Sequence, residues 1–244
     1  MLEVHDLSKS FGGLRAVKGV SFDVPAGSIT ALIGPNGAGK TTTFAMAAGF
    51  IPPDDGRVRF RDTDVTGWRP DRIAALGMVR TFQITQPFAG LSVMENIRVG
   101  AFLRTADRGD AEAVARDVGT RLGLGSLLDR PASALTVSGR KRLEVARALA
   151  TAPALLLLDE VMAGLNPVEI NEIVLLIRAV RDGGVTILLI EHVMQAVSAL
   201  AEHVHVLAEG ELIASGPPKA IAADARVVEA YLGRGAAERM ARHD

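Results

Sequence analysis

A glycine-rich segment with a lysine and consecutive threonines is the part of the sequence best suited to chemistry. Residues 34–41, GPNGAGKT, match the pattern G-x-x-x-x-G-K-[ST] and follow the apolar run ITALI at 29–33. In such a segment backbone N–H groups surround the phosphates of a nucleotide, Lys40 adds a positive charge, and the Thr41 hydroxyl can ligate Mg²⁺. A tight glycine turn without function is the alternative, but the strand before the segment and the helical pattern after it favour phosphate binding. The predicted nucleotide-binding residues of this segment are Gly34, Pro35, Asn36, Gly37, Ala38, Gly39, Lys40, Thr41 and Thr42.

Two adjacent acids could complete this chemistry. Asp159 and Glu160 follow the apolar run ALLLL at 154–158, and open α/β sheets bind ligands at the carboxyl ends of such strands. We expect Asp159 to hold Mg²⁺, directly or through water, and Glu160 to act as general base for an attacking water. The alternative is that the two acids only begin a loop. Glu160 is the residue that predicts hydrolysis of the nucleotide.

A second apolar run, VTILLI at 185–190, is followed by Glu191 and His192. A histidine at the end of a buried strand can sense or polarise the γ-phosphate side of a nucleotide site. It can also be an ordinary residue at the start of a helix. The residue pattern alone leaves both interpretations open.

The elements that must position these residues follow from the apolar pattern. Residues 1–33 are predicted to be rich in strands, with apolar and polar side chains alternating over 20–24. The sequence NPVE at 166–169 predicts a helix start with a capping box, and the glycines at 183–184 predict its end. A hairpin is predicted around 209–210, with a helix after it.

Composition narrows the class of protein. The chain has 244 residues, of which 48% are hydrophobic, so it can bury one large core. A formal net charge of -1 gives no global basic field for nucleic acid, and the absence of cysteine excludes disulfides and thiolate metal sites. The N-terminus lacks the pattern of a signal peptide, and the apolar runs are too short to span a bilayer. We therefore expect a soluble, cytoplasmic protein.

The order of motifs along the chain resembles the ATP-binding subunits of ATP-binding-cassette (ABC) transporters. The resemblance covers essentially the whole chain and rests on GPNGAGKT, RTFQ, the segment LTVSGRKRLEVARALA, LLLLDE, AGLNP and IEH. It implies an α/β fold: a P-loop NTPase core with a mixed sheet, an N-terminal antiparallel β region and an inserted α-helical subdomain. The implied boundaries are a core lobe at about 1–83 and 151–232, a helical subdomain at about 84–150 and a tail at 233–244.

The resemblance also implies roles for single residues. Gln83, at the end of RTFQ, would ligate Mg²⁺ and couple to a membrane subunit, with Gln86 as the nearby alternative. His192 would contact the γ-phosphate. Phe11 would stack on adenine, where the family commonly has a tyrosine, because a phenylalanine keeps the π face.

The segment at 135–150 departs from the family's signature sequence, Leu-Ser-Gly-Gly-Gln. Leu135 matches, but TVSG at 136–139 replaces the next four residues, and three cations follow at 140–142, where a helix dipole disfavours them. The resemblance implies that Thr136, Ser138 and Gly139 contact ATP held by a second subunit. The alternative is that these cations are only solvated, with Glu144 pairing back to one of them. The segment AGLNP departs as well, because Asn166 replaces an aspartate, and Val161 replaces the proline common after Glu160.

The resemblance extends to partners and function. The helical lobe would receive a coupling helix of the membrane partner, and Phe88, Leu91, Val93 and Met94 would form that groove or pack inside the lobe. Together with RTFQ and AGLNP, a C-terminal YLG at 231–233 is similar to the ATPases of branched-chain amino-acid importers. The implied protein is an ATPase that uses ATP and Mg²⁺ to drive uptake of branched-chain amino acids or related amide or urea-like solutes.

Its implied partners are a second ATPase subunit in a homo- or heterodimer, transmembrane permease subunits and a periplasmic or extracellular solute-binding protein, with no nucleic acid. The subunit would sit on the inner face of the cell membrane through the permeases. One alternative is the ATPase of a lipopolysaccharide exporter. Another is an ABC-type ATPase that acts on DNA or ribosomes, although the coiled-coil insertion or tandem cassettes usual in that class are not present.

Overall fold

The computed structural model of the chain describes residues 1–81 and 86–232. It divides into two compact units, one made of Met1–Pro70 and the chain from Thr186 on, the other of Asp71–Val185. In unit 1 the elements are β1 (Leu2–Phe11), β2 (Leu14–Val24), β3 (Ile29–Ile33), α1 (Lys40–Ala47), β4 (Asp55–Phe60), β5 (Thr63–Asp64), β8 (Thr186–Ile190), α7 (Met194–Leu200), β9 (His203–Ala208), β10 (Glu211–Gly216), α8 (Pro218–Ala222) and α9 (Ala225–Leu232).

The elements of unit 2 are α2 (Pro70–Leu76), which begins one residue before the unit, β6 (Met78–Arg80), α3 (Val93–Ala101), α4 (Arg108–Arg121), the short 3₁₀ helices η1 (Gly125–Leu127) and η2 (Ala132–Ala134), α5 (Val137–Leu149), β7 (Leu155–Asp159) and α6 (Pro167–Asp182). Within residues 1–81 and 86–232, no helix combines the length and apolar character needed to cross a membrane.

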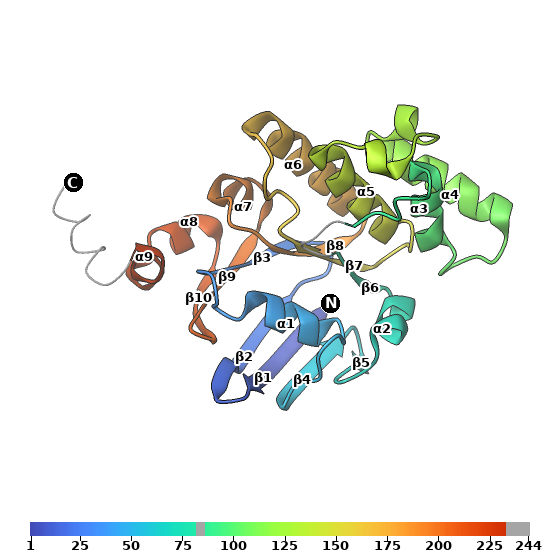
Figure 1. Cartoon of the computed structure of the whole chain (residues 1–244). Helices are drawn as coiled ribbons and strands as arrows, with labels where there is room; N and C mark the ends of the chain where they lie inside the picture. Colours follow the sequence, from blue (N-terminus) through green and yellow to red (C-terminus); the bar gives the residue numbers. More distant parts are fainter. Residues whose placement is uncertain (82–85, 233–244) are drawn as a thin grey trace. The chain divides into compact units, whose positions relative to one another are not determined.

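An antiparallel sheet forms the first part of unit 1. Its strands lie in the order β2-β1-β4-β5 (Figure 1), with Leu2 opposite Val24 on one side and Phe60 on the other. The alternation predicted for residues 20–24 is confirmed, since Val20, Phe22 and Val24 are buried and the two polar residues between them are exposed. The register of β1 against β4 shifts between His5 and Ser8, so the second half of β1 is offset from the first.

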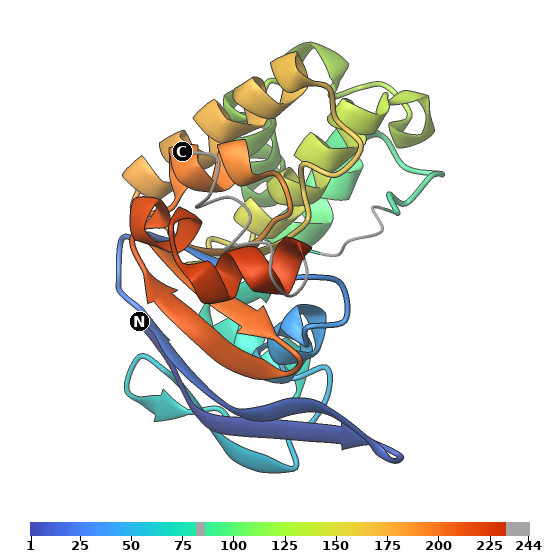
Figure 2. The same cartoon turned by 90° about the vertical axis from the view of Figure 1, so that its left-hand side faces the viewer.

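Unit 1 also holds strands that carry the glycine-rich segment. Strand β3 pairs in parallel with both β8 and β9, and every residue of β3 and β8 is buried, which explains their unbroken apolar sequences. Strands β9 and β10 form the predicted hairpin with Glu209 and Gly210 at its turn. Helices α8 and α9 lie along this hairpin (Figure 2).

Unit 2 contains a parallel strand pair and most of the helices. Strands β6 and β7 pair in parallel, and α3, α4 and α5 pack against one another (Figure 1). The predicted start of α6 is confirmed: the Asn166 side chain accepts hydrogen bonds from Val168 N and Glu169 N at 3.0 Å, and the Glu169 carboxylate accepts one from Asn166 N. The helix ends at Asp182, with Gly183 as its C-cap.

Unit 2 is longer than the helical subdomain expected at 84–150, because it also includes the β6–β7 pair and α6. The expected boundaries of that subdomain therefore stay a prediction.

Candidate functional site

The glycine-rich segment connects β3 directly to α1. Gly34 and Gly39 have φ angles of 149° and 98°, which side chains rarely adopt. A Cβ atom on Gly34 would overlap the Leu207 carbonyl oxygen, and one on Gly39 would lie 2.5 Å from the Ala16 carbonyl oxygen. Gly39 is also the N-cap of α1 and has no side chain to satisfy the first N–H groups of the helix. The segment therefore presents backbone N–H groups at a helix N-terminus, as phosphate binding requires.

Lys40 is held inside this segment. Its side chain is buried, with 5% of the residue exposed, and Nζ donates hydrogen bonds to the carbonyl oxygens of Gly34 at 2.8 Å and Pro35 at 3.0 Å. These two hydrogen bonds hold the ammonium next to the glycine-rich segment. Thr41 is exposed at the start of α1, whereas Thr43 is buried and donates to the Gly39 carbonyl oxygen.

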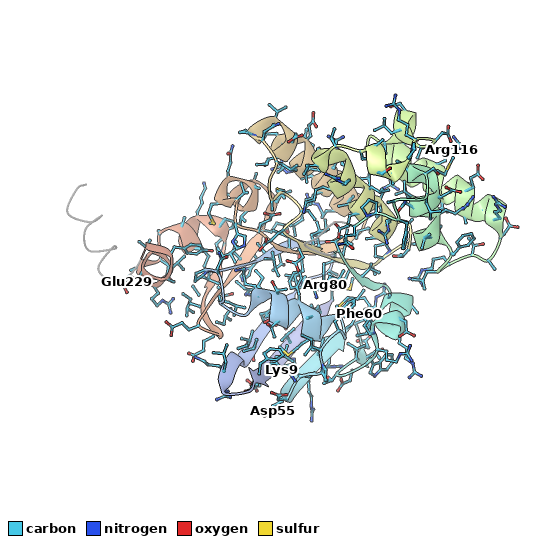
Figure 3. All side chains as sticks on the ribbon, in the orientation of Figure 1. Lys9, Asp55, Phe60, Arg80, Arg116 and Glu229 are labelled. Atoms are coloured by element: carbon cyan, nitrogen blue, oxygen red, sulfur yellow. The ribbon has the colours of Figure 1, made fainter. Side chains whose placement is uncertain are left out.

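Phe11 lies at the end of β1 with 47% of the residue exposed, so its ring is accessible for stacking. The Lys9 ammonium lies 5.8 Å from the ring centroid, and Nζ donates to Asp54 Oδ1 at 2.7 Å (Figure 3, where Lys9 is labelled). Asp54 Oδ2 accepts from Ser10 N at 2.7 Å, and Asp54 N donates to the Ser8 carbonyl oxygen at 2.9 Å. The hydrogen bond from Lys9 holds the pKa of the Asp54 carboxyl below its usual value. One aspartate thus fixes three consecutive residues just before Phe11.

A residue of the C-terminal helix also contacts the glycine-rich segment. The Tyr231 phenol of α9 lies near the Gly34 backbone N–H. Burial raises the pKa of the Tyr231 phenol, and the neighbouring Gly34 N–H opposes the rise. The YLG sequence, used above only for its resemblance, therefore begins with a side chain next to Gly34.

His192 lies between β8 and α7, two residues before Met194, and is exposed. It therefore lies two residues after the end of the buried strand β8, near the strand end at which a ligand-contacting histidine is predicted.

In unit 2 the predicted metal ligand Asp159 is the last residue of β7. Its side chain is 0% exposed, and Oδ2 accepts a hydrogen bond from Arg80 Nη2 at 2.7 Å. Asp159 N donates to Thr81 Oγ1 at 3.1 Å. Oδ1 is buried and has no hydrogen-bond partner within residues 1–81 and 86–232. A buried carboxylate oxygen with no such partner fits a ligand for a hard cation such as Mg²⁺.

Within the described part of the chain, no group of three or more His, Asp or Glu side chains could hold a metal ion. Mg²⁺ commonly binds through one or two carboxylates together with substrate phosphates and water.

The predicted general base, Glu160, has a left-handed backbone with φ of 51°, which is unfavourable for a residue with a side chain. Its carbonyl oxygen accepts a 3.2 Å hydrogen bond from Lys141 Nζ, and Lys141 itself is buried. Such strained conformations persist where surrounding contacts enforce them, and they are concentrated at functional sites.

The basic segment at 135–150 begins helix α5. Thr136 is its N-cap and accepts from Gly139 N at 3.1 Å. Ser138 is buried, whereas Val137 is 48% exposed. Of the three cations, Lys141 donates to the Glu160 carbonyl oxygen and Arg142 pairs with Glu172.

The structure sorts the predicted residues into two groups. Unit 1 holds Phe11, the segment 34–42 and His192, and unit 2 holds the acids at 159–160 and the segment 136–139. Gln83 lies outside the described residues, as does the tail at 233–244.

Three residues at the site were not among the sequence candidates: Arg80, Thr81 and Lys141. Arg80 and Thr81 belong to RTFQ, in which Gln83 was the predicted site residue, and Lys141 belongs to the basic turn. A buried cation next to a buried acid can be suspected from sequence when both occur at strand ends, but the pairing depends on strand register.

Comparison with known proteins decides the family. A sequence profile described as "ABC transporter" matches residues 17–163, more than half of the chain. The chain belongs to the ABC transporter family. A second profile, described as "Branched-chain amino acid ATP-binding cassette transporter", matches residues 211–237 of this ABC cassette.

The cassette also matches whole relatives. It is 39% identical to the high-affinity branched-chain amino acid transport ATP-binding protein LivG of Escherichia coli, over 96% of this chain and 98% of the relative. The corresponding protein BraF of Pseudomonas aeruginosa is 37% identical, again over 96% of this chain and 98% of the relative. These relatives match nearly end to end, so the resemblance stated from the motifs is confirmed.

Among solved structures, a nucleotide-free ATP-binding cassette of an ABC transporter matches with a TM-score of 0.88 and 32% identity, over 96% of this chain and 99% of that one. The ADP conformation of a similar cassette matches with a TM-score of 0.87 and 33% identity, with the same coverage of both chains. The predicted α/β fold of the ABC ATPases is therefore confirmed.

Proposed function

We propose that this ABC ATPase hydrolyses ATP to power import of branched-chain amino acids, or of related amide or urea-like solutes. The observation that carries the proposal is the 39% identity to LivG, which extends over 96% of this chain and 98% of the relative. The profile match at 211–237 supports the same branch independently of the nucleotide motifs.

The residues support a defined division of labour. Lys40 and the backbone N–H groups of the segment 34–39 bind the phosphates, and Phe11 stacks on adenine. Thr41, Asp159 and Gln83 hold Mg²⁺, which when bound neutralises charge that develops on the phosphates. Glu160 takes the proton of the attacking water, and His192 contacts the γ-phosphate and orients it.

The signature segment gives the reaction a mechanical output. Thr136, Ser138 and Gly139 contact the ATP of a second cassette, which is either a second copy or a similar chain. ATP then joins the two cassettes, and its hydrolysis lets them separate. Permease subunits convert this movement into transport, a solute-binding protein delivers the solute from outside, and the cassette works on the inner face of the membrane.

The proposal is tested by purifying the chain with its membrane subunits and measuring uptake of labelled leucine into vesicles that contain ATP and Mg²⁺. We expect Glu160→Gln to abolish uptake. The variant should still bind ATP and accumulate as a dimer. A matched control is Glu172→Gln, an acid of the same unit that pairs with Arg142.

Recovery of the chain with lipopolysaccharide-export subunits, or with ribosomes or DNA, would overturn the substrate assignment. A Glu160→Gln variant that stays monomeric with ATP would contradict the coupling of ATP to dimerisation.

A further inference from the structure

The pairing of Asp159 with Arg80 is unusual in its burial and in its supporting contacts. The Arg80 side chain is 8% exposed and the Asp159 side chain 0%, and 2.7 Å separates Arg80 Nη2 from Asp159 Oδ2 (Figure 3, where Arg80 is labelled). Arg80 ends strand β6, which runs parallel to β7 with Arg80 opposite Leu157. A side chain at the end of β6 can therefore reach the acid at the end of β7.

The next residue fixes the backbone of the same aspartate. Thr81 N donates to the Leu157 carbonyl oxygen at 2.9 Å, and Thr81 Oγ1 accepts from Asp159 N at 3.1 Å. Thr81 is itself buried. Two consecutive residues thus hold Asp159. Thr81 contacts the backbone N–H of Asp159, and Arg80 contacts the carboxylate of Asp159, so the rotation of this carboxylate is restricted.

The contacts distinguish the two carboxylate oxygens. Oδ2 is occupied by the guanidinium, whereas Oδ1 has no hydrogen-bond partner in the described part of the chain. A buried carboxylate without a compensating cation is costly, and the buried guanidinium of Arg80 supplies that cation next to Asp159. Groups that form hydrogen bonds to a metal ligand, and so orient it, affect metal affinity without contacting the metal.

We propose that Arg80 is a positioning residue that holds Asp159 Oδ2 so that Oδ1 is the oxygen presented to Mg²⁺. This inference rests on the proposed role of Asp159 as a metal ligand. Arg80 contributes two separable properties: a positive charge that balances the buried carboxylate, and a hydrogen bond from Nη2 that fixes Oδ2. Lysine supplies the charge but has no guanidinium Nη2 at that place, so Arg80→Lys keeps the first property and removes the second.

The test measures binding and does not depend on turnover. A non-hydrolysable fluorescent ATP analogue is titrated into the protein with EDTA and then at increasing Mg²⁺. We expect Arg80→Lys to bind the analogue in EDTA like the unmodified chain and to need about 10-fold more Mg²⁺ for half-maximal enhancement. Arg116→Lys is the matched control, because Arg116 is an exposed arginine of the same unit, paired with Glu112, and should leave the Mg²⁺ requirement unchanged.

A second measurement uses stability alone and covers the case in which a variant folds poorly. Arg80→Met should lower the urea midpoint of unfolding, and the double variant Arg80→Met with Asp159→Asn should recover part of that loss, because the uncompensated charge is gone. A double variant no more stable than Arg80→Met would overturn the charge-balancing role.

The outcomes separate this inference from the function on which it rests. If Asp159→Asn alone keeps the Mg²⁺ requirement of the unmodified chain, the metal assignment of Asp159 fails, and the inference fails with it. If Asp159→Asn raises the requirement but Arg80→Lys does not, only the positioning role of Arg80 is overturned.

Discussion

The Lys141 ammonium donates a 3.2 Å hydrogen bond to the backbone carbonyl oxygen of Glu160, the residue proposed as general base. Glu160 has φ of 51°, so its backbone is held in a conformation that it would not adopt readily on its own. The basic first turn of α5 therefore has an internal role. One of its cations stabilises the segment that follows the acid strand.

Lys141→Met should lower kcat about 10-fold with little change in KM, because a lost hydrogen bond to a charged donor costs about 1.5–3 kcal/mol and affects the placement of Glu160. Steady-state ATPase assays give both parameters. Lys141→Arg should retain part of the rate. A rise in KM with unchanged kcat would show that Lys141 acts on nucleotide binding instead.

Lys40→Ala should weaken ATP binding by roughly 10- to 100-fold, because it removes a charged hydrogen-bond donor to the phosphates. Equilibrium titration with a fluorescent ATP analogue measures the change. Lys219→Ala, at an exposed position of α8 in the same unit, is the control and should bind normally. Unchanged affinity in Lys40→Ala would remove the assignment of the phosphate-binding segment.

Val137→Glu should block ATP-driven dimerisation without destabilising the monomer. Val137 is exposed on the first turn of α5, where the helix dipole favours an acidic side chain. The added carboxylate would oppose the phosphates of a second cassette. Size-exclusion chromatography of Glu160→Gln chains, with and without Val137→Glu, tests this, and Val137→Gln controls for side-chain size. A Val137→Glu dimer that forms with ATP as before would contradict the proposed contact of the signature segment.

Asp54→Asn should reduce affinity for ATP several-fold but leave affinity for inorganic tripolyphosphate unchanged. The carboxylate fixes residues 8–10 just before Phe11, so its effect should be limited to the base. Competition against a labelled nucleotide measures both ligands. Asp55→Asn is the neighbouring control, since the Asp55 carboxylate contacts only its adjacent backbone, Gly56 N, among the described hydrogen bonds. An equal loss for ATP and tripolyphosphate would point to the phosphate-binding segment and against a base platform.

Because of His205, the free energy of unfolding should decrease in mild acid. Burial lowers its pKa from 6.5 to about 4, while its Nε2 bonds the Asp23 carbonyl oxygen at 3.2 Å and its Nδ1 bonds Ser215 Oγ at 3.0 Å. A carbonyl oxygen only accepts, so Nε2 carries the proton, and the neutral ring accepts at Nδ1. Between pH 6.5 and 4 the unfolded chain binds a proton that the folded chain excludes. The contribution of the neutral His205 to the free energy of unfolding should therefore be fully present above pH 6.5. The free energy of unfolding should fall by up to about 3 kcal/mol as the pH approaches 4.

Urea unfolding at several pH values checks this prediction. His205→Gln removes the titrating group, and its stability should vary less between pH 6.5 and 4 than that of the unmodified chain. Carboxylates titrate equally in both chains, so the difference between the curves isolates His205. Identical pH dependence would mean that another group is responsible.

The sequence was most informative where a function depends on consecutive residues. The segment 34–41, the acids at 159–160 and the capping box of α6 are each encoded within a few positions, because backbone geometry and local hydrogen bonds decide them. The buried strands β3 and β8 were predictable for a similar reason, since a strand that is covered on both faces has a nearly continuous apolar sequence.

What could not be predicted depends on register between distant segments. Arg80 meets Asp159 across 79 positions, and Lys9 meets Asp54 across 45, through strand pairing and a register shift in β1 that no local pattern specifies. Lys141 was visible as a charge, but its binding to a main-chain carbonyl depends on how α5 packs. The sequence therefore allows the candidate residues to be named, whereas the groups that orient them become visible only in the structure.

The crowding at Gly34 has a genetic consequence. Every single-base missense change in a glycine codon adds a side chain, and at this position even the smallest one would collide with the Leu207 carbonyl oxygen. Random mutagenesis followed by selection for lost transport should therefore recover complete loss-of-function alleles at this codon, with no partially active substitutions among them.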